Sequence, residues 1–252
     1  MKFIKICVEN KISVFVEKPF SHSLDNFDFI SNYVIKNKLF FYVSMQRRFH
    51  PLIQEISKII KNKEIGEIIN VQFNVNSYVP DWHKYENFID LYACRKELGG
   101  GVLLTEIHEI DLAYWFFGMP KSVSCTGGSY SNLCSGVEDT VHMNLIYEGF
   151  SVQLNMSFMQ RYTKRSFFVA GDKGYVECDF NTGKALYNYY ENDKVIEKKE
   201  EYSNDDLFYY QAQAFLGSSI NDSVYSLNSA RDSIKIVDGA KQSMKNNKVF
   251  SF

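Results

Sequence analysis

The sequence predicts an α/β segment followed by a larger α+β segment, so that a parallel sheet gives way to a large, mostly antiparallel open sheet. Three observations support this prediction. Helical and strand patterns alternate over the first sixty residues, long alternating strands follow Gly66, and two helical patterns close the chain. A chain of 252 residues buries roughly 70–75% of its unfolded surface, so it can form a sizeable core.

The first sixty residues contain five expected elements. They are a helix, a strand, a helix, a strand and a helix over residues 1–10, 14–19, 23–35, 39–44 and 51–60. Ser23 is expected to cap the second helix. This order is half of a doubly wound parallel sheet, in which ligands gather at the carboxyl ends of the strands. The charged strand exit Glu17-Lys18-Pro19 is therefore a candidate ligand site.

After Gly66 the pattern changes to strands with one apolar face. The expected strands cover residues 71–76, 141–147, 152–158, 165–169, 175–179 and 185–190, and the closing helices cover about 205–220 and 229–245. Gln153, Asn155 and Ser157 alternate with apolar residues and should point to the polar face. The apolar face should pack on helices, including one over residues 101–117.

Composition excludes several classes of partner. The formal charge of −2 gives no basic footprint for nucleic acid or an anionic membrane. The sequence has no apolar run of roughly 18 residues, the length of a membrane helix, and no signal-peptide pattern at its start. The five cysteines (Cys7, Cys94, Cys125, Cys134 and Cys178) are scattered and form no C-x-x-C pair. This predicts reduced thiols and a cytoplasmic location.

The segment from Asp81 to Gly118 has the densest set of chemically active residues. Its Gly99-Gly100-Gly101 run can turn with positive φ or approach a ligand closely. The helix that follows carries His108, and Asp111 lies three residues on, where it could hold the imidazole. A lone histidine among apolar neighbours is more often a structural residue. The second histidine of a zinc helix is absent, so we expect no metal site.

Taken in order, these features resemble one family. The motifs are Glu17-Lys18-Pro19, Arg48-Phe49-x-Pro51, Ile65-Gly66-x-Ile68, Gly99-Gly100-Gly101-Val102-Leu103-Leu104, His108-Glu109-x-Asp111 and Trp115-x-x-Gly118. They resemble the glucose–fructose oxidoreductase, inositol dehydrogenase and MocA (Gfo/Idh/MocA) family over essentially the whole chain. Asp81-Trp82-His83 and Tyr85-Glu86 resemble the branch associated with sugar and sugar-nucleotide metabolism.

The resemblance implies an oxidoreductase that uses NAD or NADP to oxidise a hydroxyl of a sugar, sugar nucleotide or cyclitol by hydride transfer. The family's catalytic lysine and histidine map onto Lys18 and His108. A lysine point charge stabilises a developing alkoxide, and a histidine accepts the hydroxyl proton. The cofactor-binding residues implied are Glu17, Lys18 and Pro19, and the substrate-binding residues implied are Trp82, His83, Tyr85, Thr105 and Asp111.

Two departures from the family pattern stand out. The aspartate that many members carry three or four residues before the histidine is replaced by Thr105 or Leu104. The glycine-rich phosphate turn that opens the family's dinucleotide-binding domain has no counterpart in the sequence, and Gly171-Asp172-Lys173-Gly174 is expected in a hairpin instead.

The resemblance therefore divides the chain into a truncated, Rossmann-like dinucleotide-binding domain (1–48) and a C-terminal substrate and oligomerisation domain (49–252). We expect the chain alone to be inactive, and to form a homodimer or homotetramer through the open sheet. The alternative is a catalytically dead remnant or interaction module that pairs through that sheet.

Overall fold

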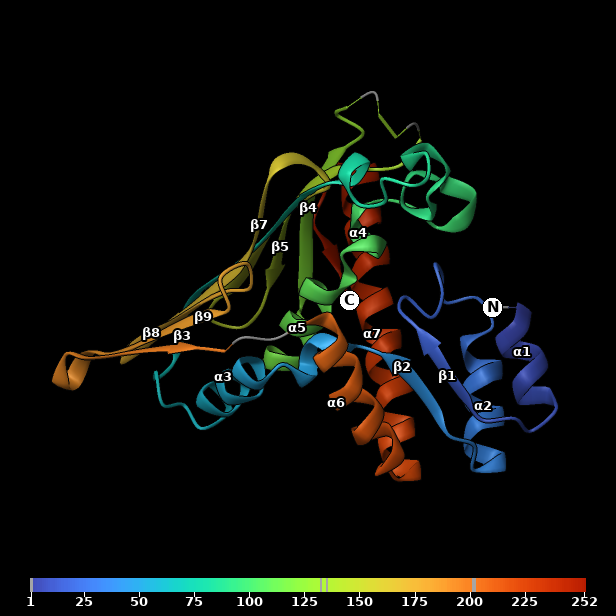
Figure 1. Cartoon of the computed structure of the whole chain (residues 1–252), viewed down its shortest axis with the longest axis horizontal. Helices are drawn as coiled ribbons and strands as arrows, with labels where there is room; N and C mark the ends of the chain where they lie inside the picture. The colour runs from blue at the N-terminus through green and yellow to red at the C-terminus, as the bar shows by residue number, and fades with distance from the viewer. Residues whose placement is uncertain (1, 132, 135, 201–202) are drawn as a thin grey trace.

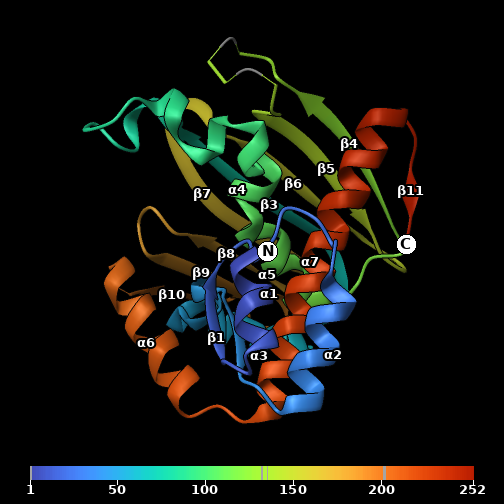
Figure 2. The same ribbon diagram turned by 90° about the vertical axis from the view of Figure 1, so that its right-hand side faces the viewer.

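The computed structural model describes residues 2–131, 133–134, 136–200 and 203–252. Within these ranges the strands form two sheets, one of two strands and one of nine (Figure 1). The small sheet lies beside α1 and α2, and the long helix α7 runs between the small sheet and the large one (Figures 1 and 2). The predicted fold class, a parallel α/β segment followed by a large, mostly antiparallel open sheet, is confirmed.

The small sheet follows the predicted order of elements. These are α1 (Lys2–Glu9), β1 (Val14–Glu17), α2 (Phe27–Asn37) and β2 (Phe41–Ser44). β1 pairs with β2 in parallel, with Glu17 opposite Ser44 at the carboxyl end. The prediction that Ser23 caps α2 is wrong, because the N-cap is Asn26, without a side-chain hydrogen bond. Ser23 Oγ instead donates to the Asp25 carboxylate at 2.8 Å in a local turn.

A 3-10 turn, η1 (Gln46–Phe49), connects β2 to α3 (Pro51–Lys61). The helix begins where predicted because Pro51 occupies its first turn, where a missing N–H costs nothing. His50 is the N-cap, and its Nδ1 accepts a hydrogen bond from the Leu52 backbone N–H at 3.1 Å. Only a neutral imidazole can accept this bond, so the cap depends on the protonation state of His50.

Acid should weaken this cap. Burial and the charge of Arg47 lower the pKa of His50 from 6.5 to about 4. Between these values the unfolded chain binds a proton that the folded chain does not, so stability falls as pH falls, by about 1 kcal/mol per pH unit. Urea unfolding at pH 7.5 and 5 measures this loss. His50→Asn keeps a capping acceptor and should lose less stability; an equal loss in both proteins would contradict the assignment.

The large sheet has the strand order β10-β9-β8-β7-β3-β6-β5-β4-β11. All neighbours pair in antiparallel fashion except β3 and β6, which are parallel. The strands are β3 (Ile68–Tyr78), β4 (Ser122–Gly128), β5 (Thr140–Ile146), β6 (Ser151–Ser157), β7 (Met159–Gly171), β8 (Gly174–Asp179), β9 (Lys184–Tyr189), β10 (Lys194–Lys199) and β11 (Phe250–Ser251). The sequence pattern missed β4, β10 and β11. The expected hairpin at 171–174 joins β7 to β8.

Helices cover the apolar face of this sheet (Figure 2). They are α4 (Val102–Thr105), α5 (Ile107–Phe117) and α7 (Ile220–Asn246), whereas α6 (Asn204–Leu216) packs against η1 and the small sheet. The helix expected over 101–117 breaks at Glu106, whose φ and ψ are −101° and 33°. The last helix begins at Ile220 rather than 229, because Ser219 and Asp222 form a capping box. None of the helices in the described ranges combines the length and apolar character needed to span a bilayer.

The other face of the large sheet carries polar side chains. Gln153 is exposed, as predicted. Asn155 forms a lateral chain of hydrogen bonds, to His142 Nδ1 at 2.9 Å and to Asn74 Oδ1 at 3.2 Å. Ser157 is buried and pairs with the Thr140 hydroxyl at 2.9 Å. These bonds link β3, β6 and β5 across the face.

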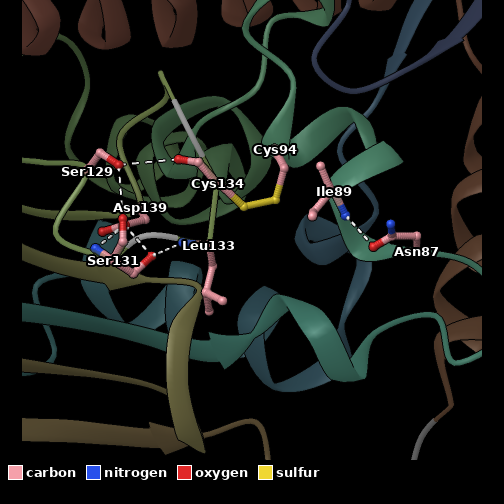
Figure 3. Close-up of a disulfide and its surroundings, with 8 residues drawn as sticks. All are labelled: Asn87, Ile89, Cys94, Ser129, Ser131, Leu133, Cys134 and Asp139. Atoms are coloured by element: carbon pink, nitrogen blue, oxygen red, sulfur yellow. Dashed lines mark hydrogen bonds between the residues drawn. A yellow bond between two sulfur atoms is a disulfide. The ribbon is translucent and has the colours of Figure 1, made fainter.

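The expectation of five reduced thiols is wrong for Cys94 and Cys134, which form a disulfide (Figure 3). Their Cα atoms are 4.7 Å apart although 40 residues separate them. The fold brings the loop after β4 to Cys94, and Asp139 shapes that loop by accepting hydrogen bonds from Ser131 N and Oγ, both at 2.8 Å (Figure 3). The spacing of Cys94 and Cys134 in the sequence does not indicate that they pair.

Candidate active site

Lys18 lies at the carboxyl end of β1, where the predicted strand exit places it. Its Nζ donates to the backbone carbonyl of Thr105 at 2.8 Å, so the strand exit touches the end of α4. Burial of the ammonium group lowers the pKa of Lys18 from its ordinary value, and the nearby carboxylate of Glu106 opposes this shift. Lys18 therefore lies in a desolvated, charged environment rather than on the open surface.

The neighbours of Lys18 in the E-K-P motif have structural contacts. The Glu17 carboxylate accepts a hydrogen bond from Ser44 Oγ at 2.9 Å, across the β1–β2 pair. Ser44 Oγ in turn accepts from Gln211 Nε2 at 2.9 Å. Pro19 follows a cis peptide bond. Glu17 thus helps join the small sheet to α6.

His108, in the first turn of α5, is buried and 3% exposed. Its Nδ1 makes no hydrogen bond with any described residue. Burial holds the pKa of His108 well below its usual value, and the positive charges of Lys18, Arg47 and Arg165 lower it further. The imidazole is therefore neutral at physiological pH, the form that can accept a proton.

The expectation that Asp111 holds this imidazole is wrong. Its carboxylate accepts from Arg48 Nε at 2.7 Å and from Arg48 Nη2 at 2.5 Å. It also accepts from Ser233 Oγ at 3.2 Å, while Arg48 donates to Ser229 Oγ. All of these groups are buried. Asp111 therefore ties α5 to η1 and α7, and the sequence spacing could not reveal this partner because Arg48 lies 63 residues away.

A buried cluster of charges surrounds Lys18 and His108. Arg165, on β7, donates to the Glu106 carboxylate through Nη2, and its Nε lies 3.2 Å from Glu109 Oε1. Burial raises the pKa of Glu109. The arginine thus bridges the break between α4 and α5.

A cavity of about 390 Å³ opens beside this cluster. Its lining includes two arginines, one carboxylate, an indole and several neutral polar groups: Arg47, Arg165, Glu106, Trp82, Asn76, Ser77, Thr163 and Asn181. The volume lies within the range of small-molecule sites, about 300–1,000 Å³. Charged and polar groups therefore converge on a space large enough for a small ligand.

The structure brings some predicted site residues together and leaves others apart. Lys18 bonds to the Thr105 carbonyl, its charge acts on His108, and Trp82 lines the adjacent cavity. His83 and Tyr85 are not among the described residues that line it. Tyr85 is 84% exposed, and its ring stacks on that of His83. These two residues form a surface pair.

Sequence reasoning missed three residues of this region. Tyr92 lies beside the Thr105 side chain, and burial raises the pKa of its phenol. Arg47 and Arg165 line the cavity from η1 and β7. Arg47 adjoins the Arg48-Phe49-x-Pro51 motif, so the motif could have drawn attention to it. Arg165 lies in an ordinary strand pattern, and nothing in the sequence marked it as a site residue.

The described residues do not fit a complete dinucleotide. A pyrophosphate is normally held by a glycine-rich turn ahead of a helix. The run before α4 is filled by protein instead: a Cβ on Gly101 would meet the Glu138 carboxylate at 2.3 Å, and one on Gly100 would meet the carbonyls of Tyr92 and Ala93 at 2.6 Å. The loop between β1 and α2 contains no glycine. Lys18 can serve only the ligand group that reaches the end of β1.

Two curated dehydrogenases are similar to part of this chain. The chain is 24% identical over 180 residues to trans-1,2-dihydrobenzene-1,2-diol dehydrogenase of Xenopus tropicalis. The aligned region covers 69% of this chain and 50% of that protein. The Xenopus laevis enzyme of the same name is 25% identical over 178 residues, with the same coverage. The match spans about half the length of these curated relatives.

Solved structures share the fold. An inositol dehydrogenase homolog from Azotobacter vinelandii, complexed with NAD+, has a TM-score of 0.87 at 14% identity and covers 100% of this chain and 75% of that one. Levoglucosan dehydrogenase, complexed with NADH and levoglucosan, has a TM-score of 0.84 at 13% identity, with coverage of 99% and 76%. Residues 53–177 match the family described as GFO/IDH/MocA C-terminal domain. Residues 53–177 thus form a C-terminal domain of the GFO/IDH/MocA family.

Proposed function

We propose that this chain forms the alcohol-binding part of an NAD(P)-dependent oxidoreductase acting on a hydroxyl group of a sugar, sugar nucleotide or cyclitol. The observation that carries the proposal is that Lys18 donates to the Thr105 carbonyl while its charge helps to keep the buried His108 neutral. A structure bound to NADH and myo-inositol and one bound to levoglucosan, both of proteins with this fold, support the class of substrate.

The two residues have complementary roles in this proposal. The Lys18 ammonium stabilises the negative charge that develops on the reacting oxygen. Neutral His108 takes the hydroxyl proton, and general-base catalysis of this kind is worth about 10²–10⁴-fold in rate. The proposal also divides the chain into a dinucleotide-binding domain (1–48), which supplies the Lys18 strand exit, and a substrate domain (49–252). Helix α7, in the substrate domain, contacts both β2 and β4, so it links the two domains.

The 252-residue chain should bind the dinucleotide weakly when tested alone. Lys18 offers a single charge contact, and a hydrogen bond to a charged group contributes about 1.5–3 kcal/mol, whereas micromolar binding needs about 8 kcal/mol. Calorimetric titration with NADH and NADPH, with and without excess myo-inositol, should show no micromolar binding, and turnover should be absent. Micromolar binding would contradict this reading of the glycine run. If myo-inositol also gives no binding signal, the alternative of a remnant or interaction module gains support.

The polar face of the large sheet should mediate self-association. The His142–Asn155–Asn74 chain of hydrogen bonds occupies a broad face that the described helices leave uncovered (Figure 1). A stable interface buries about 800 Å² per partner, which such a face can supply. We expect light scattering at micromolar concentration to report a homodimer or homotetramer. Asn155→Arg should shift it toward monomer; a monomeric wild-type chain would refute the expectation.

A further inference from the structure

Two arginines from separate elements line the cavity beside Lys18 and His108. Arg47 comes from η1 and lies over the ring of Phe180, 5.2 Å from its centre. Arg165 comes from β7, its side chain is 17% exposed, and it forms ion pairs with Glu106 and Glu109. Both line the same cavity of about 390 Å³. Their planar guanidinium groups suit bidentate binding of a carboxylate or phosphate.

The charges around the site leave it net positive. Lys18, Arg47 and Arg165 supply three cations, against the carboxylates of Glu106 and Glu109. His108 is neutral, and Glu106 and Glu109 both pair with Arg165. The same cations lower the pKa of His108, so the field at the site is positive. An anionic ligand would be attracted there, and a cationic one repelled.

The remaining lining suits a polyhydroxylated ligand. Asn76, Thr163 and Asn181 offer amide and hydroxyl groups as neutral partners. The Ser77 hydroxyl lines the same cavity and is buried without a hydrogen-bond partner among the described residues, so a ligand hydroxyl could satisfy it. The indole of Trp82 offers an apolar surface to a sugar ring. The cavity volume is near the lower end for ligand sites, about 300 Å³, which favours a single ring or chain.

We propose that the compound bound at this site is a small polyhydroxylated anion, a sugar carboxylate or sugar phosphate, whose charged group is bound by Arg47 beside Arg165. Its reacting hydroxyl then faces Lys18 and His108, so the inference rests on the proposed function and narrows its substrate class. Arg47 becomes the residue that determines specificity for charge. Arg165 shapes the site through its ion pairs with the two glutamates.

The experiment is calorimetric titration of the full chain with D-gluconate and D-glucose 6-phosphate, each against D-glucose and myo-inositol. We expect one of the anions to bind at least about 10-fold more tightly than the neutral compounds, the value of one charge-assisted hydrogen bond. The two anion arms tell a carboxylate site from a phosphate site. Arg47→Gln should remove this advantage, whereas Arg47→Lys should keep part of it.

Arg161→Gln is the matched control. Arg161 lies on the same strand as Arg165 but is exposed and stacks on Tyr78, outside the cavity lining, so anion binding should not change. Equal affinity for anions and neutral polyols, or an Arg47→Gln protein that folds and keeps the advantage, would overturn the inference while leaving the proposed function intact. Failure to bind any of the four compounds would overturn both.

Discussion

Asp111→Ala is expected to lower the free energy of unfolding by about 3–5 kcal/mol, the usual cost of breaking a buried ion pair. The side chains of Asp111 and Arg48 are 2% and 9% exposed. Removing the carboxylate leaves a buried guanidinium, and the Ser233 hydroxyl loses one of its partners. The penalty is large because the remaining charge cannot reach water without opening the contact between α5 and α7.

Urea unfolding of the wild-type and variant chains measures this effect. Glu67→Ala provides the matched control, because Glu67 pairs with Lys63 on the surface, where the side chains are 74% and 66% exposed. Such a pair contributes about 0–1 kcal/mol. A similarly small loss for Asp111→Ala would show that the buried pair does not tie the helices together. It would also reopen a role for Asp111 at the substrate.

His108→Leu should have the opposite effect on stability, raising the free energy of unfolding by about 1–2 kcal/mol. The variant removes a buried polar ring whose Nδ1 has no partner among the described residues, and an unsatisfied buried group costs about 1–3 kcal/mol. A site residue kept for chemistry often lowers stability in this way. In an assembly that supplies the dinucleotide, the same change should lower turnover by at least about 10²-fold.

Unfolding of the His108→Leu chain separates two readings of this histidine. A structural histidine satisfied by its surroundings would lose hydrogen bonds on replacement, so stability would fall. His142→Leu serves as a control, because this exposed ring bonds to Asn155 on the far face of the sheet and its loss should not affect binding of polyols. A fall in stability for His108→Leu, with polyol binding kept, would contradict the catalytic assignment.

Much of the fold followed from local pattern. The strict alternation at residues 152–156 matches β6, whose apolar residues are buried. Gly66 was part of a motif, and the structure explains it: its φ is 80°, and a Cβ there would lie 1.7 Å from the Asp172 carboxylate. The missed strand β10 is mostly exposed and has no apolar face to produce an alternating pattern.

The candidate site was harder to predict because its contacts are long-range. Lys18 and His108 were found through a resemblance of motifs, and Lys18 reaches this region by a hydrogen bond to the Thr105 carbonyl that spans 87 residues. Asp111 was assigned from helix spacing, but a stronger cationic partner on another element binds its carboxylate. Arg165 lies in no recognisable motif. It pairs with Glu106 and Glu109 only because the fold places β7 opposite the break between α4 and α5.

The most direct test of the account is nitrogen NMR of the imidazole rings in histidine-labelled chain, with and without a polyol or sugar acid. The chain has five histidines, so His142 and His83 act as internal controls outside the site. The account predicts that His108 keeps the signals of a neutral imidazole from pH 8 to about pH 5.5, since its pKa lies well below 6.5. It also predicts that ligand shifts His108 alone among these three rings. A His108 that becomes charged near pH 6.5, or that does not respond to any polyol or sugar acid, would contradict it.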